Sequence, residues 1–117
     1  MSCPLDYSLC DRTVTLYRLK DGQVLRSVLE GCFFSRQEEE GQDLTGAWRK
    51  VKCYLIHPGP EVLLCPGDRV FEGVGPEIGP EEWRDFIPEK VQELAAINYI
   101  RPCYWQGQVC HTEAGWQ

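Results

Sequence analysis

The sequence predicts a mainly β protein, a small antiparallel barrel or sandwich of about six strands with one short helical insertion. Short runs rich in β-branched and aromatic residues recur along the 117 residues, and glycine or proline turn signals separate them. One segment alone combines a helix-start pattern with an apolar stripe. The length fits one domain, which we divide into an N-terminal arm (1–12) and a β-barrel-like core (13–117) with a helix near residues 80–92.

The composition is that of an ordinary globular chain. Charged residues make up 26% and hydrophobic residues 43%, and the formal net charge of −6 disfavours nucleic acid and anionic lipid as partners. No apolar run approaches the roughly 20 residues that a membrane span needs. The N-terminus lacks the charged leader and apolar segment of a signal peptide, so we expect none.

The segment Thr13–Phe34 predicts a β-hairpin. Its two β-rich runs flank Asp21-Gly22, a pair that readily adopts the positive φ angles of a two-residue turn. The predicted opposite pairs are Leu19–Val24, Arg18–Leu25, Tyr17–Arg26, Leu16–Ser27, Thr15–Val28 and Val14–Leu29. Neither face is cleanly polar, so both need cover, from the core and from a helix or a neighbouring subunit. This pattern hints at assembly.

The polar segment Ser35–Gly46 holds the one charge run of the chain, Glu38, Glu39 and Glu40. We interpret the segment as a solvated, mobile hairpin tip. Acidic side chains on a loop that becomes ordered on docking make a plausible electrostatic contact. The three glutamates are therefore the predicted partner-contact residues.

The segment Ala47–Pro58 alternates in polarity and predicts a strand. The inward set is Ala47, Arg49, Val51, Cys53 and Leu55, and the outward set is Trp48, Lys50, Lys52, Tyr54 and Ile56. Lysines beside aromatic rings can bind single-stranded nucleic acid. More often such a row is the wet face of a strand, with lysine stems lying along the rings, and we favour that interpretation.

A glycine-rich stretch follows the turn at Pro66-Gly67 and the predicted strand Asp68–Val74. Its glycines at positions 73, 75 and 79 could pass for a nucleotide-binding loop. Such a loop needs backbone N–H groups that point at a phosphate, and Pro76 and Pro80 each remove one. The stretch therefore predicts a winding connection.

A short helix is predicted to start near Pro80, where a missing N–H costs nothing. Trp83, Phe86 and Ile87 form its apolar stripe, and Pro88 limits the first helical segment. We expect Trp83 and Phe86 to pack on the sheet.

The C-terminal region predicts a strand from Leu94 and then a hairpin that turns at Gln106-Gly107. A two-residue turn there places Trp105 opposite Gln108, and Tyr104 opposite Val109. The same register puts Cys103 opposite Cys110, within the range that a disulfide bridges.

The seven cysteines include no C-x-x-C pair, and His57 and His111 lie far apart in the sequence. We therefore predict no metal site and no cofactor. The odd cysteine count and the missing signal peptide disfavour a disulfide framework, so we expect reduced thiols, Cys103 and Cys110 included. No nucleophile, base or acid stands in a recognisable catalytic arrangement, which predicts that the protein is not an enzyme. A metal-dependent or thiol enzyme remains a third hypothesis, which elemental analysis for zinc would test.

Four short motifs follow one another along the chain: TVTLYRL, VLRSVLEGCFF, CPGDRVFEGVGPEIGPEEWRDF and ELAAINYIRP. Their order resembles a family of small structural-module proteins of tailed bacteriophages and Gram-positive prophages. Members typically carry TVTLYN-like and TVLEGVFF-like strands, then a GD-x-x-x-x-G strand, a short helix and a final β-hairpin. The resemblance runs from Thr13 to about Trp116. It departs at Cys32, where the family pattern has Val, and in the extra cysteines of the terminal hairpin.

The resemblance implies a virion structural subunit, of head–tail connector, head-closure or minor capsid type. Its implied partners are other phage structural proteins, portal, adaptor or tail, with a possible homo-oligomeric ring. The implied location is the host bacterial cytoplasm during assembly, and then the virion. The alternative function is a cytoplasmic small β-barrel module that binds a peptide or small ligand; a shallow aromatic pocket in a strict monomer would favour it.

Overall fold

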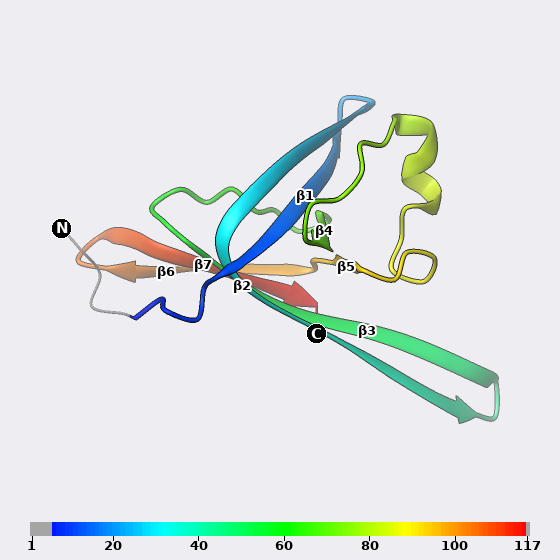
Figure 1. The fold of residues 1–117 in the computed structure, drawn as a ribbon. Coiled ribbons are helices and arrows are strands. Elements are labelled where there is room, and N and C mark those ends of the chain that lie inside the picture. Colours follow the sequence, from blue (N-terminus) through cyan, green and yellow to red (C-terminus); the bar gives the residue numbers. More distant parts are fainter. Residues whose placement is uncertain (1–5, 117) are drawn as a thin grey trace.

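The computed structural model describes residues 6–116, which form seven strands and one short 3₁₀ helix (Figure 1). The strands are β1 (Arg12–Lys20), β2 (Gln23–Asp43), β3 (Gly46–Pro58), β4 (Arg69–Glu72), β5 (Leu94–Ala96), β6 (Tyr99–Trp105) and β7 (Gln108–Trp116). They make one antiparallel sheet in the order β5-β4-β1-β2-β3-β7-β6. The predicted mainly β class is confirmed. The sheet has two edge strands, β5 and β6, and is not closed into a barrel.

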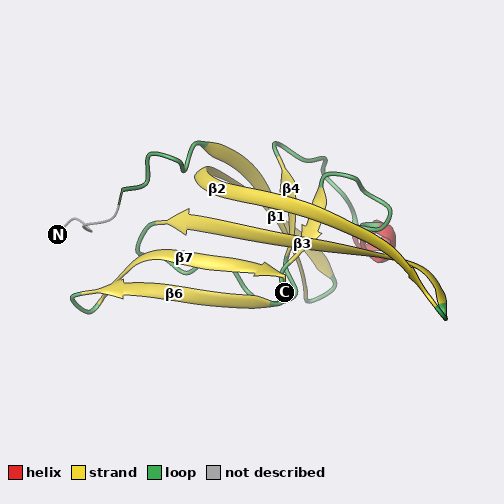
Figure 2. Ribbon diagram, turned by 90° about the horizontal axis from the view of Figure 1, so that it is seen from below, coloured by secondary structure: helices red, strands yellow, loops and turns green. Residues whose placement is uncertain are grey.

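The long strand β2 belongs to two parts of the sheet. Its first part pairs with β1, and its last part, from Phe33, pairs with β3 (Figure 2). Where the partner changes, β2 carries one residue more than β1 between the pairs Arg12–Cys32 and Val14–Leu29. Gly31 lies in this bulge with a φ of +70°, a conformation that glycine adopts without strain. The bulge marks the point at which β2 leaves one partner strand for the next.

Buried side chains from both parts of the sheet meet in one core. The cluster contains Val14, Leu16, Leu29 and Val70 from the first part, and Cys53, Leu55 and Ala114 from the second. Val70, Cys53 and Leu55 are buried, as their alternation predicts. The outer residues of the predicted inward set, Ala47 and Arg49, are exposed, because β3 extends there beyond the core.

A second cluster covers the other face of the β1–β2 hairpin. Tyr17 of β1 is fully buried against Phe86, with ring centroids 4.6 Å apart, and its Oη donates a hydrogen bond to the carbonyl of Pro76 (2.7 Å). Leu94 completes the buried part, and Trp83 packs against it. The chain itself therefore covers this face around Tyr17, whereas Leu19 and Val28 on the same face stay 43% and 40% exposed.

The helix is shorter than predicted. The 3₁₀ helix η1 (Pro80–Asp85) has proline in its first turn, and a separate turn at residues 87–91 follows it. Pro88 between them carries no N–H, which prevents one continuous helix near 80–92. Trp83 and Phe86 pack in the second cluster, as predicted, and the guanidinium carbon of Arg69 lies 3.8 Å from the centroid of the Trp83 ring.

The glycine-rich stretch is a winding connection, as predicted. The Gly73 amide donates to the carbonyl of Thr13 (2.8 Å), and the Gly75 amide donates to Oγ1 of Thr15 (2.8 Å). The Gly75 carbonyl accepts from Nη2 of Arg26 (2.5 Å). These backbone groups hold the connection to the β1–β2 hairpin.

Both predicted two-residue turns are present, and one predicted register is wrong. All six pairs predicted for β1 and β2 are observed, with φ angles of +53° at Asp21 and +76° at Gly22. In the β6–β7 hairpin the two pairs next to the turn are also as predicted. A bulge then places Cys103 opposite His111, not opposite Cys110. The extra residue on β7 is Cys110, whose carbonyl accepts a hydrogen bond from the Gly59 amide (2.8 Å).

The thiol prediction holds in part. Cys103 is free, as are Cys10, Cys32, Cys53 and Cys65, whereas Cys110 is disulfide-bonded and was wrongly predicted to be a thiol. That prediction rested on the expected reducing compartment, set against a predicted pairing with Cys103 that would have permitted a disulfide. The bulge removes this pairing. Cys3, expected to be reduced as well, lies outside the described residues.

The predicted N-terminal arm falls only partly within the described chain. Residues 6–11 precede β1 without joining the sheet, and residues 1–5 lie outside the description. Tyr7 connects this segment to the sheet, since its Oη lies 2.7 Å from Nδ1 of His111 on β7. Within residues 6–116, no helix is long and apolar enough to cross a membrane.

Candidate assembly surface

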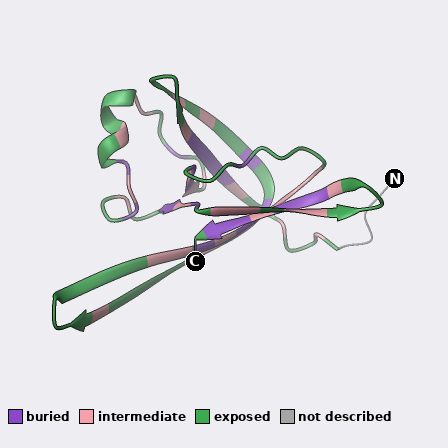
Figure 3. Cartoon of the chain, turned by 180° about the vertical axis from the view of Figure 1, so that it is seen from behind, coloured by how far each residue is buried: buried purple, intermediate pink, exposed green. Residues whose placement is uncertain are grey.

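The outer halves of β2 and β3 form a two-stranded ribbon that projects from the body (Figures 1 and 3). We define the ribbon as residues 37–52, where the two strands pair only with each other, from Gln37–Lys52 to Asp43–Gly46. The described chain measures 51 × 34 × 22 Å, with a radius of gyration of 15.4 Å. A compact chain of this length has a radius of gyration of about 13.4 Å. The ribbon therefore extends beyond the core. At its base, Val51 packs against the main cluster, and Nη1 of Arg49 donates to the Glu89 carbonyl (3.3 Å).

The prediction that residues 38–40 lie in a loop is wrong. Glu38, Glu39 and Glu40 lie in β2, opposite Val51, Lys50 and Arg49 of β3, and not in a mobile hairpin tip. The turn is confined to Leu44-Thr45. There Oδ1 of Asp43 accepts hydrogen bonds from the Thr45 amide (2.8 Å) and hydroxyl (2.5 Å). The polar sequence thus forms paired strands, in which Lys50 and Arg49 stand opposite Glu39 and Glu40.

Ion pairs link the two strands of the ribbon, and Arg36, which precedes the ribbon in β2, takes part in them. Oε1 of Glu38 lies 2.5 Å from both Nη1 of Arg36 and Nη2 of Arg49. Both hydrogen bonds lower the pKa of Glu38, and the bond from Arg36 has the larger effect. Oε1 of Glu39 lies 3.2 Å from Nζ of Lys52. Two of the three predicted contact residues are thus engaged within the ribbon.

The same pairing affects the lysine row of β3, for which nucleic-acid binding was the less favoured interpretation. Lys50 and Lys52 stand opposite Glu39 and Gln37, and the charge of Lys52 is paired with that of Glu39. The ribbon therefore presents alternating charges instead of a basic strip, which is a poor match to a phosphate backbone.

Two apolar side chains remain exposed near the end of the ribbon. Leu44 is completely exposed in the turn, and Trp48 is 44% exposed. The Trp48 indole lies across Gly41 of the paired strand, where an added Cβ would come within 2.5 Å of its ring. Sequence reasoning missed these two residues as contact candidates. The available signal was a leucine and a tryptophan inside an otherwise polar hairpin end.

Both long edges of the ribbon present backbone groups that pair with no other strand of the described chain. A two-stranded ribbon is marginally stable by itself in water, and exposed strand edges readily pair with another chain. The arrangement is therefore suited to docking on a neighbouring protein, through strand edges and an aromatic anchor.

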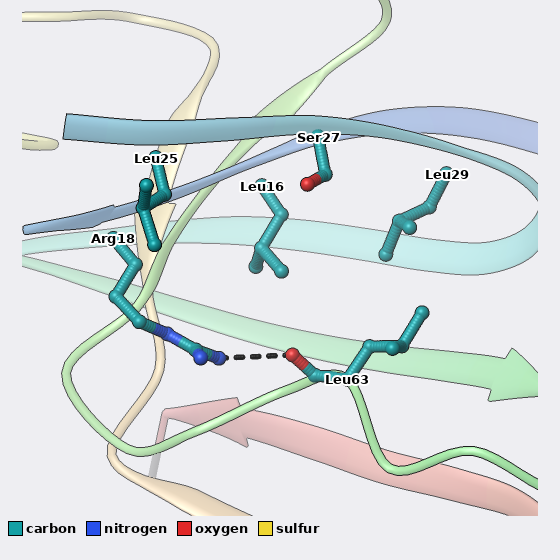
Figure 4. Close-up of a pocket in the computed structure, with 6 residues that line it drawn as sticks. All are labelled: Leu16, Arg18, Leu25, Ser27, Leu29 and Leu63. Carbon is teal, nitrogen blue, oxygen red and sulfur yellow. Dashed lines mark hydrogen bonds between the residues drawn. The ribbon is translucent and has the colours of Figure 1, made fainter. Parts of the chain in front are cut away.

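A groove of about 210 Å³ lies between the β1–β2 hairpin and the loop before β4 (Figure 4). Its lining is Leu16, Arg18, Leu25, Ser27, Leu29 and Leu63. Arg18 donates to both carboxylate oxygens of the buried Asp68 (2.7 and 2.8 Å) and to the carbonyl of Leu63 (2.9 Å). The guanidinium is thus already engaged, and the groove has no aromatic wall. It offers a small ligand few groups for recognition.

Comparison with known proteins adds no relative. No protein family, curated protein or solved structure matches the chain. The resemblance to phage structural-module proteins therefore rests on the order of its short motifs and remains an expectation.

Proposed function

We propose that this protein is a structural subunit of a tailed-phage virion, of head–tail connector, head-closure or minor capsid type. In this proposal it acts by protein–protein assembly, and the ribbon docks on a neighbouring virion protein. The observation that carries the proposal is the projection of the ribbon beyond the core, with both edges unpaired in the described chain and Leu44 and Trp48 exposed. The order of motifs from Thr13 to about Trp116 supplies the virion class.

In the proposed subunit, the two parts of the sheet that β2 joins form a sandwich-like body, and the ribbon forms its arm. An arm that reaches a different surface on the next subunit makes a heterologous contact, the type of contact that closes rings. Portal, adaptor or tail proteins are the other proposed partners. Assembly would take place in the host bacterial cytoplasm, and the subunit would then remain in the virion.

The proposed contact combines edge pairing with an anchor. A strand added to the ribbon edge satisfies its free backbone groups, and burial of Trp48 supplies the apolar contact typical of interface hot spots. Glu38 and Glu39 act within the ribbon, by holding it straight through Arg49 and Lys52. Glu40 is exposed and remains the proposed acidic contact of the predicted three.

Two matched tryptophan variants test the role of the ribbon. Trp48 and Trp105 are each 44% exposed, one near the end of the ribbon and the other beside the turn of the β6–β7 hairpin. In a phage that carries the gene, Trp48→Ser should lower the yield of infectious, tailed particles at least tenfold, as counted by plaques and electron microscopy. Trp105→Ser should leave that yield within about twofold of wild type.

Equal yields from the two variants would reject the ribbon as the docking element. Deletion of the gene tests the functional class separately, since loss of a connector should leave heads without joined tails. Normal tailed particles after the deletion would reject the virion role itself. A portal gene and a major capsid gene close upstream would support the class independently.

A further inference from the structure

We propose that Cys103, His111 and Glu113 form a binding site for one Zn²⁺ ion on the β6–β7 hairpin. Cys103 belongs to β6, and the other two residues belong to β7. Their ligand atoms, one from each residue, all lie within 4.8 Å of one another. Nε2 of His111 and Oε1 of Glu113 are 3.5 Å apart. The site lies away from the ribbon and does not depend on the proposed function.

The bulge at Cys110 creates this juxtaposition. It places Cys103 directly opposite His111 and leaves Arg101 opposite Glu113. Because side chains two residues apart on a strand share a face, His111 and Glu113 point to the same side. In a hairpin without the bulge, Cys103 would face Cys110, and His111 would lie on the opposite face. A local irregularity of β7 thus assembles a thiol, an imidazole and a carboxylate.

The donor set matches the chemistry of zinc. Thiolate sulfur, imidazole nitrogen and carboxylate oxygen are its usual protein ligands, at bond lengths of about 2.0–2.3 Å. Tetrahedral coordination at such lengths separates neighbouring ligand atoms by roughly 3.3–3.8 Å. The His111–Glu113 separation already falls in this range, and rotation of the Cys103 side chain can close the remainder. Cys103 is half-buried, which leaves a path to solvent and a fourth position for water.

Neighbouring side chains orient the two β7 ligands. Tyr7 Oη lies 2.7 Å from Nδ1 of His111, so a proton on Nδ1 can be donated to Tyr7, with the lone pair left on Nε2. Nε of Arg101 donates to Oε2 of Glu113 (2.8 Å), and Oε1 is the oxygen that faces His111. Hydrogen bonds of this kind to the remaining atoms of the ligands are typical of protein zinc sites. The imidazole is also nearly buried, with 8% of its side chain exposed, so its position is well defined.

Cobalt provides the direct test, because Co²⁺ takes zinc sites and reports thiolate ligation by a charge-transfer absorption band. The full chain, freed of metal and kept anaerobic, should develop this band with one equivalent of Co²⁺. One equivalent of Zn²⁺ should then abolish the band and raise the melting temperature of the protein. Cys65→Ser, which removes an exposed free thiol outside the site, is the matched control and should behave as wild type.

The variants separate a metal site from a purely structural network. Cys103→Ser should remove the band and weaken zinc binding at least tenfold, while the circular dichroism spectrum stays unchanged. Glu113→Gln should retain the band but require at least tenfold more Co²⁺, and Cys103→Ala serves as a second thiol variant. The proposal is overturned if wild type shows no thiolate band with excess Co²⁺. Persistence of the band in both Cys103 variants would overturn it equally.

Discussion

The two ends of β2 form hairpins of the same pairing type with different surroundings. Near its start, β2 pairs with β1, and the hairpin packs one face on the main core and the other on the cluster around Tyr17. Near its end, β2 pairs with β3 in the ribbon, where nearly every side chain is exposed (Figure 3). Regular strand pairing is therefore common to both regions, and only the first gains stability from burial.

The contacts that stabilise the two regions also differ. Tyr17 is completely buried at the first hairpin, whereas Leu44 is completely exposed at the ribbon turn. In the ribbon the contacts are cross-strand ion pairs such as Glu39 with Lys52, and solvent-exposed pairs of this kind stabilise weakly. The first hairpin should accordingly resist local opening, and the ribbon should not.

The largest expected effect is that of Tyr17→Ala. It removes a fully buried ring that contacts Phe86, so we expect a loss of about 3–5 kcal/mol in the free energy of unfolding. Tyr17→Phe keeps the ring and removes the hydroxyl, with its hydrogen bond to Pro76 and its contact with Arg26, and it should cost about 1 kcal/mol. Urea denaturation measures both. A cost below about 1 kcal/mol for Tyr17→Ala would contradict the view that the cover on this face is stabilising.

Trp83→Ala should have an intermediate effect. The ring packs on the second cluster but is only partly buried, so we expect about 2 kcal/mol, less than for a fully buried aromatic residue. The same denaturation experiment applies, with exposed Glu82→Ala on the same helix as the control. If Trp83→Ala costs well under 1 kcal/mol, the tryptophan faces a partner, and Phe86 is the residue that covers Tyr17.

The smallest expected effect is that of Trp48→Ser in the ribbon of the isolated protein. Because Trp48 lies outside both clusters, the unfolding free energy should change by less than about 1 kcal/mol. Amide hydrogen exchange sharpens the comparison: the amides of β1 should exchange slowly, and those of residues 40–49 should exchange far faster. Equal protection of the two regions would show that the ribbon is as stable as the core hairpin, against the difference in burial.

Local patterns predicted several parts of this fold correctly. The pairs Asp21-Gly22 and Gln106-Gly107 marked both two-residue turns, because few residues accept two successive positive φ angles. Once the first turn was located, the register of β1 and β2 followed as far as the bulge at Gly31. Alternation likewise identified Leu55 as a core residue of β3.

Other parts depended on contacts between segments that are distant in the sequence. The composition of the acidic run at 38–40 predicts a loop, but the run is a strand that pairs with residues 49–51 of β3 and forms ion pairs with Arg49 and Lys52. The open edges of the sheet depend on how all seven strands are placed, which no single segment specifies. The proposed contact residues Leu44 and Trp48 emerged only when the ribbon was seen to extend beyond the core.

By itself, the sequence determined the β class, the turns and the pairings next to them, because these follow from backbone preferences and side-chain alternation over a few residues. Tertiary structure alone decided where β2 leaves β1 for β3, and which residue faces Cys103. The Gly59 amide donates a hydrogen bond to the Cys110 carbonyl, and Cys110 is the extra residue of the bulge that brings His111 opposite the Cys103 thiol. Such shifts of one residue depend on long-range contacts, and for that reason the Cys103, His111 and Glu113 cluster was invisible in the sequence.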